Sequence, residues 1–301
     1  MIINNKKHPL VSIIMNCHNG ENYLEDAIKS IINQTYKNWE LVFWDNCSKD
    51  KSRIIFKNFS DKRFRYFYSS KYTTLYEARN KALAKTRGEY ISFCDTDDMW
   101  MKNKLELQVE KFKNKRIGLV YSNYIIQQDE IQQSVVYSKK KLPEGNLKNF
   151  TFDEYKIGIL TVIFRKKFFT KYKINFNSIY NIIGDFDFIL RLTKVTNFLC
   201  IQEPLAIYRI HKNNFSNNNF SMHISELEHW IHQQQNVSDN IHIKYVEKKI
   251  NNMRIISDIY QGNKIKAFIK ITKLPLSYQK IRLIIILIIP IIILKKIKNI
   301  N

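Results

Sequence analysis

The first hundred residues alternate between apolar, β-branched runs and segments that repeat apolar side chains at helical spacing. The strand-like runs are residues 11–15, 41–44, 65–68 and 90–94, and the helical segments are residues 21–33, 50–59 and 75–86. Alternation of this kind builds βαβ units around a parallel sheet. The sequence therefore predicts an α/β domain with a mostly parallel central sheet.

Three acids follow the fourth strand-like run directly: Asp95, Asp97 and Asp98. Ligand sites of open α/β sheets lie outside the carboxyl ends of strands. The formal net charge is +22, so acids are scarce, and neighbouring carboxylates repel one another unless something neutralises them. A divalent cation does so, because Mg²⁺ and Mn²⁺ prefer carboxylate oxygens. The alternative is an N-cap, in which Asp97 or Asp98 begins a helix over residues 102–112.

The pattern becomes mixed after about residue 118. We expect strands over residues 119–124 and 159–164, a short last strand over residues 204–210, a polar segment at 127–133 and a helix over residues 184–195. The Asn-rich segment at 213–219 suggests a domain boundary, which gives a domain of residues 1–216 and an extension of residues 217–301.

The extension is basic and contains one long apolar run. Residues 224–259 are expected to be largely helical, and no acid follows residue 259. The apolar run at 283–294, interrupted by Pro290, is shorter than the ~20 residues that a membrane span needs. Its basic flanks favour peripheral attachment to an anionic membrane, since lipids attract such residues. The alternative is a core or dimer-interface element.

Charge and cysteines limit the surroundings of the protein. A net charge of +22 fits nucleic acid, an anionic membrane surface or a phosphorylated substrate as a partner. Aromatic–basic interleaving is not evident, so we expect no nucleic acid partner. The cysteines lack metal-ligand spacing, and no signal peptide is visible, which favours a cytoplasmic, reducing location.

Four segments carry a resemblance when taken in order: residues 11–20, residues 33–50 with Asp45-Asn46-Cys47-Ser48, residues 78–100 with Asp95-Thr96-Asp97-Asp98, and residues 184–191 followed by Tyr208-Arg209-Ile210-His211. Together they resemble the family 2 glycosyltransferases, which are inverting, nucleotide-sugar-dependent enzymes. The resemblance covers about residues 10–216. It implies a single Rossmann-like domain of the GT-A type, followed by a helical basic extension.

The chain departs from the family pattern at three places. His18 stands where the family usually has Tyr or Phe in its first loop. Cys47 replaces the turn glycine of the second motif, and Gly184 stands where a Glu often precedes the acid of the acceptor segment. The last departure makes Asp185 the candidate catalytic base and leaves Asp187 as the second choice.

The resemblance implies roles for the residues on the donor side. Asp97 would bind the divalent metal, Mn²⁺ or Mg²⁺, and Asp95 would contact the ribose or support the metal. Asp45, expected to be exposed at its strand end, would accept a hydrogen bond from the base; an Asx-turn is the alternative. His18 and Asn16 would line the same mouth, while Asp98 would cap the following helix. Arg79 would pair with a phosphate or with Asp95, or lie on a solvated helix face.

Two residues belong to the remaining segments. Asp185 would take the proton of the acceptor hydroxyl as a general base, although an acid at a helix start is also an ordinary cap. His211 would complete the metal shell or steady the pyrophosphate, or be structural.

The resemblance thus implies a metal-dependent glycosyltransferase of the hexosyltransferase type, whose acceptor is a glycan or lipid-linked glycan. By analogy, it would act in cell envelope polysaccharide synthesis at the inner face of the cell membrane. One alternative is a non-catalytic nucleotide-sugar binder or assembly scaffold. A less favoured one is a metal-dependent phosphodiesterase or nuclease, since acids and a His also fit a two-metal site.

Overall fold

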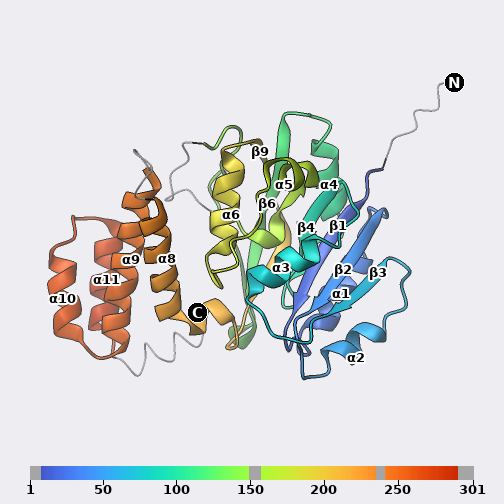
Figure 1. Ribbon diagram of the computed structural model, residues 1–301. Helices are drawn as coiled ribbons and strands as arrows, with labels where there is room; N and C mark the ends of the chain where they lie inside the picture. Colours follow the sequence, from blue (N-terminus) through green and yellow to red (C-terminus); the bar gives the residue numbers. More distant parts are fainter. Residues whose placement is uncertain (1–7, 149–156, 235–240, 291–301) are drawn as a thin grey trace. The chain divides into compact units, whose positions relative to one another are not determined.

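The computed structural model describes residues 8–148, 157–234 and 241–290 (Figure 1). The chain forms two compact units. The first contains the described residues up to Arg209, apart from Gln128–Gln133. The second contains Gln128–Gln133 and the described residues from Ile210 onward.

The first unit is built on one sheet, in which the described strands run β3-β2-β1-β4-β8-β6-β9-β5, with β7 paired to β6. Their bounds are β1 Val11–Cys17, β2 Trp39–Asp45, β3 Phe64–Tyr68, β4 Tyr90–Phe93, β5 Met99–Trp100, β6 Ile117–Gln128, β7 Gln133–Val136, β8 Ile163–Arg165 and β9 Asn197–Ile210. Strands β1 to β4 are mutually parallel, whereas β8 and β5 pair antiparallel with their neighbours. The predicted α/β fold is therefore confirmed.

Helices cover both faces of the parallel strands. The helices of this unit are α1 Leu24–Ile32, α2 Ser52–Lys57, α3 Leu75–Leu83, α4 Lys104–Lys111, α5 Lys166–Tyr172 and α6 Gly184–Thr193. One face packs Ile13 and Phe43 against apolar residues of α1 and α2, such as Ile28 and Phe56. On the other face, Phe93 stacks with Phe164 and meets Phe176 edge-on. Successive side chains along each of these strands therefore point into two different cores, one on each face of the sheet.

Some segments differ from the sequence-based expectation. Residues 159–164 do not form one strand, because Ile159–Thr161 is a 3₁₀ turn in which the Thr161 hydroxyl donates to the Gly158 carbonyl. The expected last short strand is the long β9, and helix α4 begins two residues later than expected. Burial accounts for the first error, since buried turns and buried strands are equally apolar.

The second unit is helical in its described part. Its helices are α7 Phe215–Asn218, α8 Phe220–Gln234, α9 Ile241–Tyr260, α10 Lys264–Thr272 and α11 Tyr278–Ile288. Ile255 and Ile259 of α9 form a small core with Ala267 and Ile271 of α10 and Leu283 of α11. Within the described residues, no helix has both the length and the apolar character needed to cross a membrane. The run predicted at 283–294 begins inside α11, and its residues 291–294 lie outside the described part.

Candidate active site

Two loops at the carboxyl ends of β1 and β2 are held together by hydrogen bonds. The Asn46 backbone N–H donates to the Cys17 carbonyl at 2.7 Å. The Asn19 N–H donates to the Ser48 hydroxyl at 3.1 Å, and the Asn19 side chain accepts from the Lys49 N–H at 2.8 Å. These bonds explain why the sequence places small polar residues here, since each one satisfies a loop backbone group. The two loops therefore form one continuous edge, which we call the rim and which consists of residues 17–19 and 46–49.

Cys47 occupies the turn position at which the resembled family has glycine. Its φ is +67°, in the left-handed region that a residue with a Cβ adopts at a cost. The turn is thus kept although the glycine is lost.

Asp45 lies beneath this rim and is not exposed, contrary to the prediction. Only 1% of it is accessible, because its carboxylate accepts from the Ser48 N–H at 2.8 Å and from the Tyr66 hydroxyl at 2.7 Å. Burial, followed by the bond to Asp45, raises the pKa of Tyr66, which keeps that hydroxyl a donor. Asp45 therefore forms the turn that was the alternative to base binding, and its base-binding role stays a prediction.

His18 is exposed on the rim, and its predicted place at the mouth of the nucleotide site stays a prediction. Its Nδ1 lies 2.9 Å from the Asn46 carbonyl oxygen, and its ring centroid lies 4.5 Å from that of Tyr72. Tyr72 is itself 56% exposed, so the two rings form an aromatic ledge open to solvent. Tyr72 was not among the predicted site residues, because it belongs to an irregular loop; an aromatic residue soon after the third strand was the available signal.

Asn16 does not line the mouth directly, because its side chain is buried in β1. Neither its Oδ1 nor its Nδ2 has a hydrogen-bond partner among the described residues, and the same holds for Nε1 of Trp44, its register neighbour on β2. A buried amide without partners is costly and is a feature of functional sites. Its predicted contact with a nucleotide stays a prediction.

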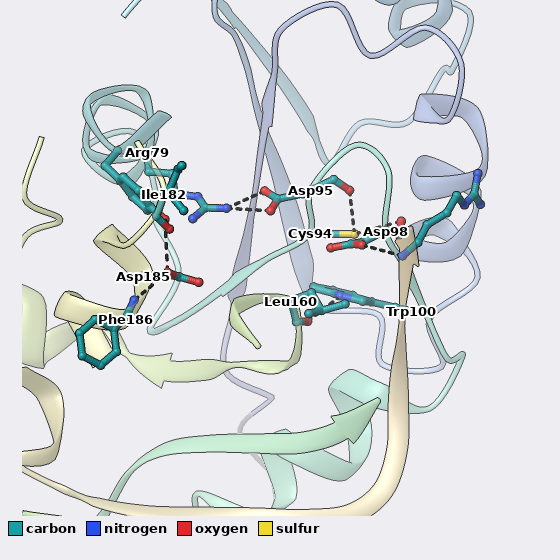
Figure 2. Close-up of polar contacts among 11 residues, drawn as sticks. Arg79, Cys94, Asp95, Asp98, Trp100, Leu160, Ile182, Asp185 and Phe186 are labelled. Carbon is teal, nitrogen blue, oxygen red and sulfur yellow. Dashed lines mark hydrogen bonds and ion pairs between the residues drawn. The ribbon is translucent and has the colours of Figure 1, made fainter. Parts of the chain in front are cut away.

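Arg79 and Asp95 form the central ion pair of the site (Figure 2). One terminal nitrogen of Arg79 donates to both carboxylate oxygens of Asp95 at 2.8 Å. The guanidinium is 2% exposed and lies 5.2 Å from the Tyr76 ring centroid and 5.6 Å from that of Phe93. The predicted pairing with Asp95 is confirmed, whereas the solvated helix face is wrong. Aromatic walls and an ion pair suit guanidinium better than ammonium.

Asp98 does not cap the next helix, contrary to the prediction. It is buried, and its carboxylate accepts from the backbone N–H of Arg209 at 3.3 Å, while the residue preceding α4 is Asn103. Burial, and then the charges of Asp97 and Asp95, raise the pKa of Asp98 well above its usual range.

Asp97 is partly exposed, and Asp95 also retains 30% exposure. No three His, Cys, Asp or Glu side chains converge as a ready-made metal cage in the described parts of the chain. This arrangement still fits a Mg²⁺- or Mn²⁺-type ion, because such ions commonly take one or two carboxylates and complete their shell with substrate phosphates and water.

Asp185 lies in the first turn of α6, on the other side of Arg79 from Asp95 (Figure 2). It is partly exposed, and its Oδ1 accepts from the Phe186 N–H at 2.7 Å and from the Tyr76 hydroxyl at 3.3 Å. Burial raises the pKa of Asp185, and the charge of Arg79 partly opposes that shift. A carboxylate with a raised pKa binds a proton more readily than an ordinary one.

The neighbouring acid Asp187 has a different environment. It is buried and forms an ion pair with Arg191 at 2.6 Å, one helical turn further along α6. Gly184 explains why α6 begins so close to α3, since a Cβ there would lie 2.4 Å from the Tyr76 ring. The structure thus favours Asp185 over Asp187 as the accessible acid.

His211 belongs to the second unit, and its ring contacts Asn213 and Asn214 there. Its predicted role in the metal shell stays a prediction.

The first unit therefore combines a parallel sheet with a polar rim at its strand ends, a surface-exposed aromatic ledge and acids on both sides of one arginine. This combination defines an α/β protein with a polar ligand site at the carboxyl ends of its parallel strands. The family model "Glycosyl transferase family 2" matches residues 12–190, and the chain belongs to that family.

Relatives with known names agree with this assignment. The chain is 36% identical over 154 residues to WfgD of Escherichia coli, named UDP-Glc:alpha-D-GlcNAc-diphosphoundecaprenol beta-1,3-glucosyltransferase; the match covers 51% of this chain and 59% of that protein. It is also 36% identical over 118 residues to the putative teichuronic acid biosynthesis glycosyltransferase TuaG of Bacillus subtilis, covering 38% of this chain and 47% of the relative. The matches thus span about half the length of these relatives.

A solved structure shows the same fold at low identity. TarS of S. aureus, in complex with UDP, has a TM-score of 0.59 at 14% identity and covers 89% of this chain and 76% of its own. At such identity the likeness shows the fold alone, and that fold is the GT-A type.

Proposed function

We propose that the protein transfers a sugar from a nucleoside-diphosphate donor to a lipid-linked glycan, with inversion at the anomeric carbon. The observation that carries the proposal is the arrangement of acids around Arg79: Asp95 is paired with it on one side, and the partly exposed Asp185 lies on the other (Figure 2). Family membership supports the same activity.

The donor would bind at the rim of the β1 and β2 loops. The His18–Tyr72 ledge offers aromatic surface for a base, and Asp45 lies beneath it as a hydrogen-bond acceptor. The solved complex of TarS contains UDP, which supports a nucleoside diphosphate as the ligand class.

A divalent cation would be held by Asp97, with Asp95 supporting the site through its bond to Arg79. Such an ion would stabilise the negative charge that develops on the leaving diphosphate. The donor set fits, since hard cations prefer carboxylate and phosphate oxygens. A further fold neighbour, the mannosyltransferase PcManGT of Pyrobaculum calidifontis, was solved in complex with GDP-Man and Mn²⁺, which supports a metal here.

Asp185 would act as the general base for the acceptor hydroxyl. Its Oδ1 accepts from the Phe186 N–H and shares the Tyr76 hydroxyl with the Ile182 carbonyl, so Oδ2 is the oxygen that would accept the proton. A single displacement with one base inverts the anomeric centre. The name of WfgD contains a diphosphoundecaprenol-linked sugar, which supports a lipid-linked acceptor.

Incubation with a panel of nucleotide sugars and Mn²⁺, without an acceptor, tests the proposal. We expect slow release of the nucleoside diphosphate from one donor, and loss of that release in EDTA or in Asp97→Asn. Release of nucleoside monophosphate would instead identify a phosphodiesterase. Thermal stabilisation by a nucleoside diphosphate, without hydrolysis or transfer, would identify a non-catalytic binder.

A further inference from the structure

Helices α10 and α11 of the second unit each have an inward and an outward side. The inward side packs Ala267 and Ile271 of α10 and Leu283 of α11 against Ile255 and Ile259 of α9. Part of the apolar run that begins at residue 283 is therefore an internal packing element, as the alternative sequence interpretation held. With Ile286 and Leu287, which pack partly against it, this core takes five of the twelve Ala, Ile, Leu and Phe side chains in the two helices.

The outward side carries apolar side chains that stay largely exposed in the described part of the chain. We call it the hairpin face, and it consists of Ile265, Phe268, Ile269, Leu276, Ile281, Ile284, Ile285 and Ile288, which are 38% to 87% exposed. These are nearly half of the large hydrophobic side chains that the described chain exposes. Single exposed hydrophobic residues are ordinary, but a gathered set marks an interaction surface.

The spacing within each helix makes each set one continuous stripe. In α10 the exposed residues lie three and four positions after Ile265, and in α11 they lie three, four and seven positions after Ile281, which puts each set on one side of its helix. The Lys264 ammonium donates to the Ile289 carbonyl at 3.1 Å, which brings the start of α10 beside the end of α11. Lys280 donates to the Thr272 and Leu274 carbonyls at the opposite end. The two stripes therefore lie on adjoining antiparallel helices.

The charged residues of the helices and turn that carry the hairpin face all have one sign. Six basic residues and no acid occur between Lys264 and Pro290: Lys264, Lys266, Lys270, Lys273, Lys280 and Arg282. Lys266 and Lys270 contact Asp258 of α9, whereas Lys273 and Arg282 are exposed. An apolar stripe with cationic edges complements a surface that is anionic outside and apolar beneath. A second copy of this chain fits less well, since it would bring cationic edges and a net charge of +22 against their like.

We propose that the hairpin face binds an anionic lipid bilayer, with α10 and α11 lying in the plane of the interface. The isoleucines and Phe268 would enter the boundary between headgroups and acyl chains, and the lysines would lie at the lipid phosphates. This inference deepens the proposed function, because the use of such a surface rests on a lipid-linked acceptor. The binding itself does not depend on catalysis.

The test compares two double variants of the full chain. Ile265→Glu/Ile288→Glu changes the two isoleucines that are 80% and 73% exposed, whereas Ile54→Glu/Val135→Glu changes residues of the first unit that are 62% and 58% exposed. Both variants lose the same net charge and neither disturbs a buried residue. Flotation with vesicles rich in phosphatidylglycerol should show a partition coefficient at least about tenfold lower for the first variant than for wild type. The second variant should bind like wild type, and salt should weaken both.

Equal binding by both variants would overturn the proposal, as would a wild-type protein that ignores anionic vesicles at low salt. Light scattering that shows a dimer disrupted only by the first variant would identify the hairpin face as a self-association surface instead. Donor hydrolysis in solution separates the two proposals. Intact vesicle binding without any donor hydrolysis would refute the proposed function and leave the membrane surface standing.

Discussion

Replacing Lys104 with methionine should change how the stability of the protein depends on pH. The Lys104 side chain is fully buried beneath the acidic strand end, where its ammonium donates to the Ser92 hydroxyl at 3.2 Å and lies 3.9 Å from the Trp100 ring centroid. Burial lowers the pKa of Lys104 from 10.5 to about 7. The folded protein therefore loses this proton at a pH where the unfolded chain keeps it.

The sign and the size of the effect follow from this difference. Between pH 7 and 10.5 the unfolded state binds more protons at this residue, so the free energy of unfolding rises with pH in that window. Below pH 7 Lys104 is protonated in both states and adds no pH dependence. Integrated from pH 7 to pH 9, the contribution is about 2 kcal/mol. Methionine has a similar volume and does not titrate. It leaves no buried hydroxyl unpaired, because Ser92 still donates to the Val162 carbonyl at 2.6 Å.

Urea unfolding at pH 7 and pH 9 measures this contribution. The stability of wild type relative to Lys104→Met should increase by about 2 kcal/mol between the two values. Lys102→Met is the matched control, because Lys102 is exposed and two residues away, and it should follow wild type at both values. If wild type and Lys104→Met show parallel pH profiles, the pKa of Lys104 is not lowered in the folded protein. That result would refute the prediction.

Four further variants test the site. Asp97→Ala should abolish metal-dependent donor turnover with an unchanged thermal midpoint, and wild-type rates in EDTA would contradict the metal role. Asp185→Asn should bind nucleoside diphosphate normally in calorimetry yet transfer ~10²-fold more slowly; lost affinity with full turnover would make Asp185 a donor-site residue, and Asp187→Asn would be tested next. Arg79→Lys should lower the free energy of urea unfolding by ~2 kcal/mol, and an unchanged midpoint would contradict the buried ion pair. Cys47→Gly should raise the free energy of urea unfolding by about 0.5–1 kcal/mol, because glycine adopts the positive φ without strain. A lower free energy of unfolding for this variant would refute that prediction.

The parallel core could be predicted because its strands are apolar, β-branched and ended abruptly by polar residues. The Arg79–Asp95 pair could be predicted only as one of several options, and the structure selects it because aromatic rings enclose the guanidinium. The burial of Asp45 could not be read from sequence, since it depends on a hydroxyl from β3, at Tyr66. Tyr72 was missed for a related reason, because an irregular loop has no periodicity to interpret.

Helix α3 contacts both halves of the site through a single turn. Tyr76 touches Asp185, and Arg79, three residues later, holds Asp95. One inserted or deleted residue between them would rotate one side chain relative to the other by about 100° and separate the two acids from their common support. The phase of this one turn of α3 therefore sets how the carboxylates of Asp95 and Asp185 lie relative to each other.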